Sequence, residues 1–437
     1  MALSNNKIHH TSSLIILSMK VMSNSEKEES CNSRHITWLM KSCFPTPHHI
    51  TPPITTITIT KPSSHVPTTL SSLPNDIVLD FLSRIPSSSL PSISLVCSLW
   101  SRLLISPDFL HLRRLRFLPY HTAAAITATQ YGFFFATLLN NSWNNSKFFL
   151  STCNAISIDD VYNILSHARV VSISHWVYVV GRNAMLRCDI WTSAVTLCRA
   201  MIFPRKKFAA AAVAGKIYVA GGGSRSTAVE EYDPVSDTWA VVSQAPRRRY
   251  GCIGASVDGV FYIIGGLRIG ASEQNELSRA SIGAEAHAAY ASSMDLFDVE
   301  GRVWLRSRVV PGGGCVVAAC AAAGRVYALT SHAVELSFWS FDARRKSSGR
   351  GGGAFGEWCR IKSPPLPALV RVDTRLRFSC VGMGEKVVLI QVGGCGSEVR
   401  GLKEGFVLVY DCTTGEWGRG ADLPEVFRRA AYVGVEC

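Results

Sequence analysis

The sequence predicts a mainly β protein in which a ring of small antiparallel sheets follows a small all-α module. Two observations predict this fold. Beyond about residue 130, short β-type runs alternate with glycine turns, and aromatic–aspartate pairs recur with regularly spaced tryptophans. Between residues 71 and 117, apolar residues recur instead at helical spacing. The chain has 437 residues, 47% hydrophobic and 18% charged, so it can bury a large core and form more than one domain.

Residues 1–70 show no periodic apolar face. They are rich in Ser, Thr, Pro and His, as in the run ITPPITTITITKPSS, and proline interrupts any strand. We therefore expect a disordered tail. The apolar run at residues 13–19 is too short for a signal-peptide core, and no run reaches the ~18 residues that span a bilayer. We expect no membrane contact and a location in the cytoplasm, the nucleus or both.

The net charge of +13 comes from small basic clusters that are scattered along the chain. A nucleic-acid surface usually interleaves such residues with stacking aromatics on one face, so we expect no nucleic acid partner. Attraction to an acidic protein partner is an alternative interpretation. The 14 cysteines are also scattered and no Cys-x-x-Cys occurs, which favours reduced, mostly buried thiols over disulfides.

The helical module, residues 71–117, is expected to consist of short helices. Pro74 suits a helix start, and Pro86 ends that helix because proline has no N–H to donate. Residues 87–89 are serines that can cap a second helix, and Ser106 with Pro107 marks a further start. Helices this short bury little apolar surface alone, so they either dock on the rest of the chain or bind a partner. Five apolar residues share one face of the first helix: Ile77, Val78, Phe81, Leu82 and Ile85.

The apolar pattern of this module resembles the F-box over about the full length of that family's motif. The resemblance implies that the module binds the Skp-type adaptor of a cullin–RING ubiquitin ligase. One departure is Ser98, which stands where the family usually has Lys or Arg and would weaken one polar contact. The alternative is a small helical satellite domain without a partner. The adaptor-binding residues that the resemblance implies are Leu73, Pro74, Ile77, Leu82, Ile85, Pro86, Val96, Cys97 and Trp100.

Residues 118–129 are expected to form a connector, after which repeats begin. Three aromatic–Asp pairs are each followed by five residues and a Trp, and a fourth reaches its Trp only after an insertion. Upstream of each pair stand a strand of small and apolar residues, a glycine turn and a second strand that ends in Gly-Gly or its equivalent. The pairs and their tryptophans are Tyr232-Asp233 with Trp239, Phe297-Asp298 with Trp304, Phe341-Asp342 with Trp358, and Tyr410-Asp411 with Trp417.

Each repeat unit predicts a four-stranded antiparallel sheet. The aspartates suit tight turns, and a Trp is large enough to fill the gap to a neighbouring sheet. One such sheet cannot bury both of its faces, whereas sheets packed radially bury one another and leave only short edges. The region 130–437 is therefore predicted to form a β-propeller.

The units resemble kelch repeats, through the Gly-Gly, the aromatic–Asp pair and the spaced Trp together. Residues 428–435 look like a first strand with nothing after it, whereas residues 131–139 and 147–150 look like outer strands with nothing before them. Joining these ends in one sheet would close the ring, so we predict six blades, with five as the alternative. The five complete units are residues 166–198, 207–240, 250–305, 315–361 and 376–418.

Two insertions, residues 268–293 and 343–355, interrupt the units and are expected to project from opposite faces. Loops on a rigid scaffold often carry recognition. Flexible insertions without a role are an equally good interpretation.

The sequence shows no catalytic constellation. Kelch propellers include copper radical oxidases, but His167, His175, His287 and His332 do not stand at ligand spacing. We expect no metal, no cofactor and no enzymatic activity. The two resemblances together imply a plant-type substrate-recognition subunit of a cullin–RING ubiquitin ligase, whose propeller holds a target protein of unknown identity. A propeller interaction scaffold with an idle F-box is the second interpretation, and a copper radical oxidase is the third.

Overall fold

The computed structural model describes residues 73–150, 157–223, 226–268, 290–332, 335–343, 356–366, 377–393 and 405–436. Every described residue belongs to the second of the two units of the chain, Thr69–Cys437. The tail expected at residues 1–70 lies outside the described residues, as do most of the two insertions. The fold is therefore that of the second unit.

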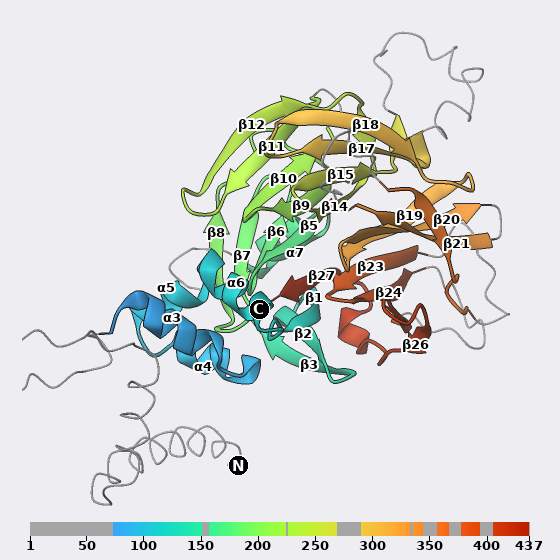
Figure 1. Cartoon of the computed structure of the whole chain (residues 1–437). Helices are drawn as coiled ribbons and strands as arrows, with labels where there is room; N and C mark the ends of the chain where they lie inside the picture. The colour runs from blue at the N-terminus through green and yellow to red at the C-terminus, as the bar shows by residue number, and fades with distance from the viewer. Residues whose placement is uncertain are drawn as a thin grey trace, which may run out of the picture. The chain divides into compact units, whose positions relative to one another are not determined.

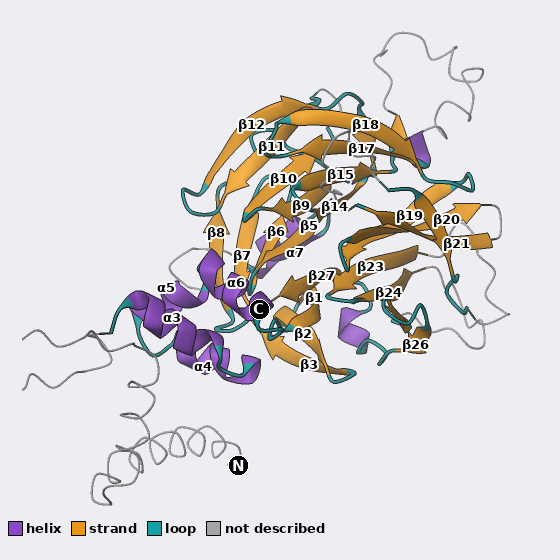
Figure 2. Ribbon diagram, viewed as in Figure 1, coloured by secondary structure: helices purple, strands orange, loops and turns teal. Residues whose placement is uncertain are grey.

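The helical module begins the described part of the chain (Figure 2). Two predicted helix starts are confirmed, since Pro74 directly precedes the first helix and the Ser106 hydroxyl accepts a hydrogen bond from the Phe109 N–H at 3.2 Å. The predicted serine cap is wrong, because residues 87–89 form a short 3₁₀ helix of their own and the Ser89 side chain makes no capping hydrogen bond to the next helix. The helices pack around a small core of their own, made by Val78, Leu82, Leu90, Leu104 and Phe109. The elements are α3 (Asn75–Ser83), η2 (Ser87–Ser89), α4 (Leu90–Ser94), α5 (Ser98–Leu104) and α6 (Pro107–Leu115).

Six sheets of antiparallel strands, the blades, follow one another around a ring (Figure 1). Blade 1 contains β5 (Arg169–Ile173), β6 (Trp176–Val180), β7 (Met185–Asp189) and β8 (Ala194–Cys198). Blade 2 contains β9 (Ala209–Val213), β10 (Lys216–Ala220), β11 (Ala228–Asp233) and β12 (Thr238–Gln244). Blade 3 contains β14 (Ile253–Val257), β15 (Val260–Ile264), β17 (Ser293–Asp298) and β18 (Val303–Val309).

The remaining blades follow the same plan. Blade 4 contains β19 (Cys315–Ala322), β20 (Arg325–His332), β21 (Glu335–Asp342) and β22 (Trp358–Ile361). Blade 5 contains β23 (Arg377–Met383), β24 (Lys386–Gly393), β25 (Val407–Asp411) and β26 (Trp417–Arg419). Blade 6 contains β27 (Ala431–Glu436), β1 (His121–Thr129), β2 (Gly132–Leu139) and β3 (Ser142–Lys147). Shorter elements between them are β4 (Phe149–Leu150), α7 (Ile158–Leu165), β13 (Arg249–Tyr250), β16 (Leu267–Arg268) and η5 (Glu425–Phe427).

Blade 6 closes the ring because it combines strands from both ends of the unit. β27 pairs antiparallel with β1, from His121 opposite Glu436 to Ile126 opposite Ala431. The prediction of a six-bladed propeller closed by the C-terminal strand is therefore confirmed.

The expected connector at residues 118–129 is wrong over most of its length, because residues 121–129 form β1. This strand lies between β27 and β2, and the whole run from Ala123 to Ile126 is buried. A continuous apolar run lacks the alternation that marks a half-buried strand in a sequence. The outer strand expected at residues 147–150 also differs, since β3 ends at Lys147 and β4 pairs in parallel with β8 of blade 1.

The innermost strands β5, β9, β14, β19, β23 and β27 contact one another in order around the ring. They approach so closely that some contacts require glycine. A Cβ built at Gly434 would lie 1.9 Å from the carbonyl oxygen of Gly382, and one built at Gly382 would lie 1.7 Å from that of Ala321. Any side chain at these positions would push neighbouring blades apart.

The aromatic and Trp residues of the repeats meet as the sequence predicts. Tyr232 lies opposite Trp239 with ring centroids 5.1 Å apart, and the equivalent pairs in blades 3, 4 and 5 are separated by 5.0, 5.2 and 5.1 Å. The indole N–H of Trp239 donates to the Arg199 carbonyl at 2.8 Å, at the end of blade 1. These tryptophans therefore fill space within a blade, and Trp239 also bonds to the blade before it.

Two buried ion pairs stabilise the loops of blades 2 and 3. Arg205 and Glu230 are both fully buried, 2.7 Å apart, and Arg205 also donates to the Gly221 carbonyl at 2.8 Å. Arg249 repeats the arrangement in blade 3, where it pairs with Asp295 at 2.8 Å and donates to the first glycine of the following Gly-Gly at 2.8 Å. Arg205 and Arg249 each come from one of the scattered basic clusters. Each forms a buried ion pair instead of contributing charge to the surface.

We expect Glu230→Gln to lower the free energy of unfolding by about 3–5 kcal/mol, because Arg205 would stay buried without a counter-charge. Glu300→Gln, at an exposed turn in blade 3, is the control and should change that free energy by less than about 0.5 kcal/mol. Urea denaturation followed by tryptophan fluorescence measures both. Equal stability of the two variants would contradict the role of the ion pair.

Candidate functional site

The helical module presents a group of apolar side chains to solvent. Ile77 is 51% exposed and Val96 is 57% exposed. Such groups remain in contact with water unless a partner covers them, so this surface is a candidate docking site. It contains six of the residues predicted to bind an adaptor: Leu73, Pro74, Ile77, Pro86, Val96 and Cys97.

The other three predicted residues belong to the core of the module. Leu82 is fully buried, and Ile85 and Trp100 are partly buried against the same core. The Leu82 side chain therefore reaches no surface from which it could touch a partner. Its place in the core instead holds α3 against the other helices.

Two exposed apolar residues of this surface, Phe81 and Leu95, are not among the predicted adaptor-binding residues. Phe81 is 56% exposed and stands one turn after Ile77 on the outward face of α3, whereas Val78 and Leu82 point inward. The signal was present in the spacing, because residues four apart on a helix share a face. The apolar residues of α3 therefore form an inward and an outward face, not the single face that the sequence predicts.

Arg113 of α6 holds the turn that carries Ile85 and Pro86. Its side chain is buried and donates hydrogen bonds to the Ile85 carbonyl at 2.7 Å, the Ser87 hydroxyl at 2.6 Å and the Leu118 carbonyl at 2.6 Å. Because a charged guanidinium must have such partners when buried, these three segments are tied to one another. The exposed surface therefore stands on a rigid support.

The module is fastened to the propeller at two places. Trp191, in the turn between β7 and β8, packs against both the core of the module and the core shared by blades 6 and 1. Arg114 of α6 donates two hydrogen bonds of 2.6 Å to the carboxylate of Glu436 at the end of β27. Burial opposes the charge on Glu436, but the bonds from Arg114 outweigh it and hold the pKa of this carboxyl below its usual value.

His175 supports Trp191 from inside blade 1. The two rings stack with centroids 3.9 Å apart and an interplanar angle of 7°. Burial lowers the pKa of His175 to about 4, although the nearby Asp189 partly opposes this effect. Asp189 also accepts the Trp191 N–H at 2.8 Å and so holds the turn in place. The folded protein therefore keeps the His175 imidazole neutral at pH 7.

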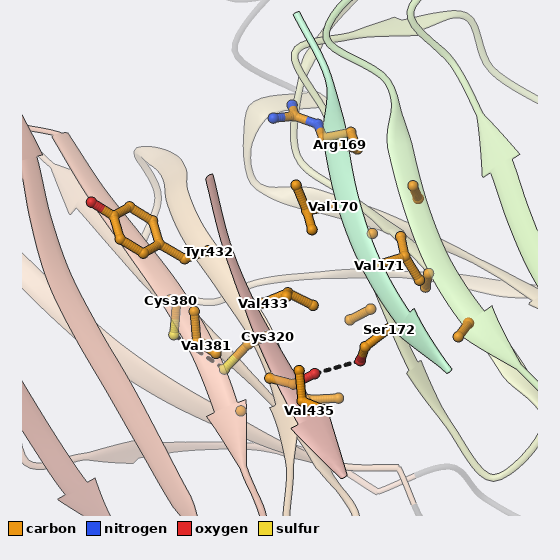
Figure 3. Close-up of a pocket in the computed structure, with 18 of the residues that line it drawn as sticks. Arg169, Val170, Val171, Ser172, Cys320, Cys380, Val381, Tyr432, Val433 and Val435 are labelled. Atoms are coloured by element: carbon orange, nitrogen blue, oxygen red, sulfur yellow. Dashed lines mark hydrogen bonds between the residues drawn. The ribbon is translucent and has the colours of Figure 1, made fainter. Parts of the chain in front are cut away.

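A central channel of about 1350 Å³ runs between the innermost strands (Figure 3). Its wall is made largely of small and apolar residues, such as Ala211 and Val433. Cys320 and Cys380, on neighbouring strands, place their sulfur atoms 3.1 Å apart. Burial raises the pKa of the Cys320 thiol well above its usual value, which makes this thiol a poor nucleophile.

Within the part of the chain that the structure describes, His167, His175 and His332 do not come together in a metal site. Among the described residues, no group of three or more His, Cys, Asp or Glu side chains could hold a metal ion. His167 and His332 are exposed, His175 is buried, and His287 lies outside the described residues. Over the same residues, no helix is long and apolar enough to cross a membrane.

A six-bladed propeller joined to a helical module with an exposed apolar surface defines the class of this protein by its architecture. Residues 204–246 match the family model of the Kelch motif. The chain is 56% identical over 426 residues to the F-box/kelch-repeat protein At5g26960 of Arabidopsis thaliana, which covers 93% of this chain and 99% of that protein. The chain therefore belongs to the F-box/kelch-repeat family, whose members are generally non-catalytic adaptors.

More distant similarities cover less of the chain. The F-box/kelch-repeat protein At1g16250 of Arabidopsis thaliana is 35% identical over 111 residues, which is 24% of this chain and 28% of that protein. The solved structure of YjhT is 18% identical, with a TM-score of 0.42 over 59% of this chain and 84% of that one. A likeness at this level adds nothing to the fold that the blades already define.

We expect Glu436→Gln to loosen α6 from β27, because a neutral amide cannot replace the paired bonds from Arg114. The free energy of unfolding should fall by only about 0.5–1 kcal/mol, since Arg114 is largely exposed. Hydrogen–deuterium exchange of the backbone of α6 should rise, and Glu425→Gln at the exposed end of η5 is the control. Unchanged exchange in α6 would mean that this ion pair does not fasten the module.

We expect stability to fall as the pH drops from about 6.5 towards 4, because the unfolded chain protonates His175 near ~6.5 while the folded protein keeps it neutral. The quantity to compare is the difference between the free energies of unfolding at pH 7 and pH 4.5. His175→Asn should make that difference smaller, whereas His332→Asn, at an exposed position, should leave it unchanged. The same difference in both variants would rule out a contribution from His175.

Proposed function

We propose that this protein is the substrate-recognition subunit of an SCF-type cullin–RING ubiquitin ligase. The observation that supports this most is the exposed apolar surface of a module that already has a core of its own. Residues such as Ile77 and Phe81 are therefore available to a partner without unfolding the module. Because the module resembles an F-box, the proposed partner is a Skp-type adaptor. Through this adaptor the protein would join the cullin and the RING subunit of the ligase.

The mechanism is proximity. The module holds the adaptor, the propeller holds a target protein, and the target is thereby kept near a ubiquitin-conjugating enzyme. Holding two reactants together raises the effective concentration of one at the other, without any bond being made by the chain that holds them. The two fastenings at Trp191 and Arg114 suit this task because they keep the module and blade 1 in one arrangement.

This proposal includes no catalytic residue, no cofactor and no metal. It also includes no nucleic acid or membrane partner, and it places the protein in the cytoplasm, the nucleus or both. The second candidate is a propeller interaction scaffold whose F-box binds no adaptor. A test of adaptor binding distinguishes this scaffold from the ligase subunit. The copper radical oxidase is the weakest candidate, because the histidines within the described residues are not gathered at one place.

We expect Leu73→Ala combined with Pro74→Ala to abolish capture of a purified Skp-type adaptor by the full-length protein. Both residues are exposed and contribute little to the core, so the propeller should stay folded. The measurement is a pull-down with the purified adaptor, together with a thermal unfolding curve. Undiminished capture would count against the proposed function.

A second pair of variants separates docking from folding. Ile77→Glu places a charge on the outward face of α3 and should also prevent capture. Val235→Glu is its control, because Val235 is 97% exposed in a turn of blade 2, far along the chain from the module. Loss of capture in both variants would point to a general defect rather than to the proposed surface.

A further inference from the structure

The innermost strands all begin at the same end of the channel. The Ser172 hydroxyl donates to the Gly434 carbonyl, so the fourth residue of β5 meets the fourth residue of β27. The Ser256 hydroxyl likewise donates to the Ala212 carbonyl at 2.6 Å, which joins the fourth residues of β14 and β9. Gly254 and Ala210, the second residues of β14 and β9, are also in contact, so these two strands run in the same direction. Figure 3 shows the arrows of β5 and β27 pointing the same way as well. Residues at their starts therefore lie at one mouth of the channel.

Three arginines line the channel at this mouth. Arg377 is the first residue of β23, Arg169 is the first residue of β5, and Arg429 stands two residues before β27. The strands β23, β27 and β5 are consecutive neighbours in the ring, so the three arginines lie on adjacent blades. Figure 3 shows Arg169 with its guanidinium at the start of β5, away from Ser172. We call these three residues the arginine mouth.

The arginine mouth carries positive charge that the described residues do not neutralise. Arg377 and Arg429 are exposed and form no ion pair with any described residue. Arg169 is partly buried and bonds to backbone carbonyls, with its Nε donating to Phe208 at 2.7 Å. Burial lowers the pKa of Arg169, but an arginine remains charged at neutral pH.

Among the described residues, the channel lining contains no carboxylate near these arginines. Glu436 is the one acidic residue among the described residues that line the channel. It is the last residue of β27, at the other mouth, and it already pairs with Arg114. A cavity lined by charge of one sign attracts a ligand of the opposite sign. This differs from Arg205 and Arg249, each of which has a buried acid of its own.

The channel also has room behind the arginines. Its volume of about 1350 Å³ and its small wall residues would admit part of an extended chain. Tyr432 lies among the lining residues near the start of β27. A surface for single-stranded nucleic acid would need several stacking aromatics interleaved with the basic groups, which the described lining does not offer at this mouth. A flexible peptide that carries carboxylates fits the site better.

We propose that the arginine mouth binds an acidic segment of the target protein. This inference rests on the proposed function and names the chemistry of the target that the propeller recognises. Arg377 and Arg429 supply charge to carboxylates that arrive from solvent, and Arg169 supplies charge at the inner edge of the mouth. The ligand is an unstructured run of Asp or Glu rather than a folded surface, because the charges line one side of a channel mouth.

The test uses the purified full-length protein and a fluorescein-labelled octaglutamate peptide, with binding followed by fluorescence anisotropy. We expect binding that weakens as NaCl is raised, and no binding of the matching octaglutamine peptide. Arg377→Glu combined with Arg429→Glu should weaken octaglutamate binding at least tenfold. Arg306→Glu combined with Arg308→Glu is the control, because both lie on β18, the outermost strand of blade 3, and it should change binding less than twofold.

Each outcome decides the proposal. Wild-type affinity in the Arg377/Arg429 double variant overturns it, as does an equal loss in the β18 control. Tighter binding of a labelled oligouridine than of octaglutamate, with the same dependence on Arg377 and Arg429, would make the mouth a nucleic-acid site instead. The Arg377→Gln and Arg429→Gln pair repeats the test without reversed charge, in case the first double variant fails to fold.

The same variants separate this inference from the proposed function. The Arg377/Arg429 double variant should still capture the Skp-type adaptor, because both residues are remote from the module surface. The Leu73/Pro74 double variant should still bind octaglutamate. Failure of adaptor capture in the wild-type protein would overturn the proposed function, whereas failure of octaglutamate binding would overturn only the arginine mouth.

Discussion

The pairing of β27 with β1 is the constraint on which the rest of the structure depends. A propeller is stable only when every blade has neighbours on both sides, and an open ring would expose a blade face and two strand edges. Here the last described strand is the innermost strand of blade 6, and the strand that follows the helical module lies beside it. The helical module therefore joins the ring at blade 6, where the two ends of the ring meet. The hydrogen bond from Arg114 to Glu436, which are 322 residues apart, lies at the same place.

This placement explains how a set of very short helices can keep an apolar surface open to solvent. Their core is small, but it is extended by Trp191 from blade 1 and braced by the buried side chain of Arg113. Stability thus comes from one side of the module while the other side remains free. A partner that binds the free side would also be held in a defined position relative to the propeller, which is what a proximity mechanism requires.

Arginine serves two different purposes in this propeller. Arg205 and Arg249 are buried, each with a carboxylate and a glycine carbonyl as partners, and they tie loops within their blades. Arg377 and Arg429 stand at the starts of innermost strands, exposed and without a carboxylate among the described residues. In the sequence, Arg205, Arg249 and Arg429 all belong to small basic clusters. Only the fold separates the arginines with buried acidic partners from those whose charge is free to attract a ligand.

The sequence by itself determined what depends on local spacing: the helix starts at Pro74 and Ser106, the aromatic–Trp pairs such as Tyr232 with Trp239, and the six-bladed ring. Only the tertiary structure decided that β1 belongs to blade 6, that Leu82 is buried while Phe81 is exposed, and which arginines have acidic partners. The physical reason is that periodicity reflects contacts within a few residues. Burial on both faces and ion pairing depend on segments that meet only after the ring has closed.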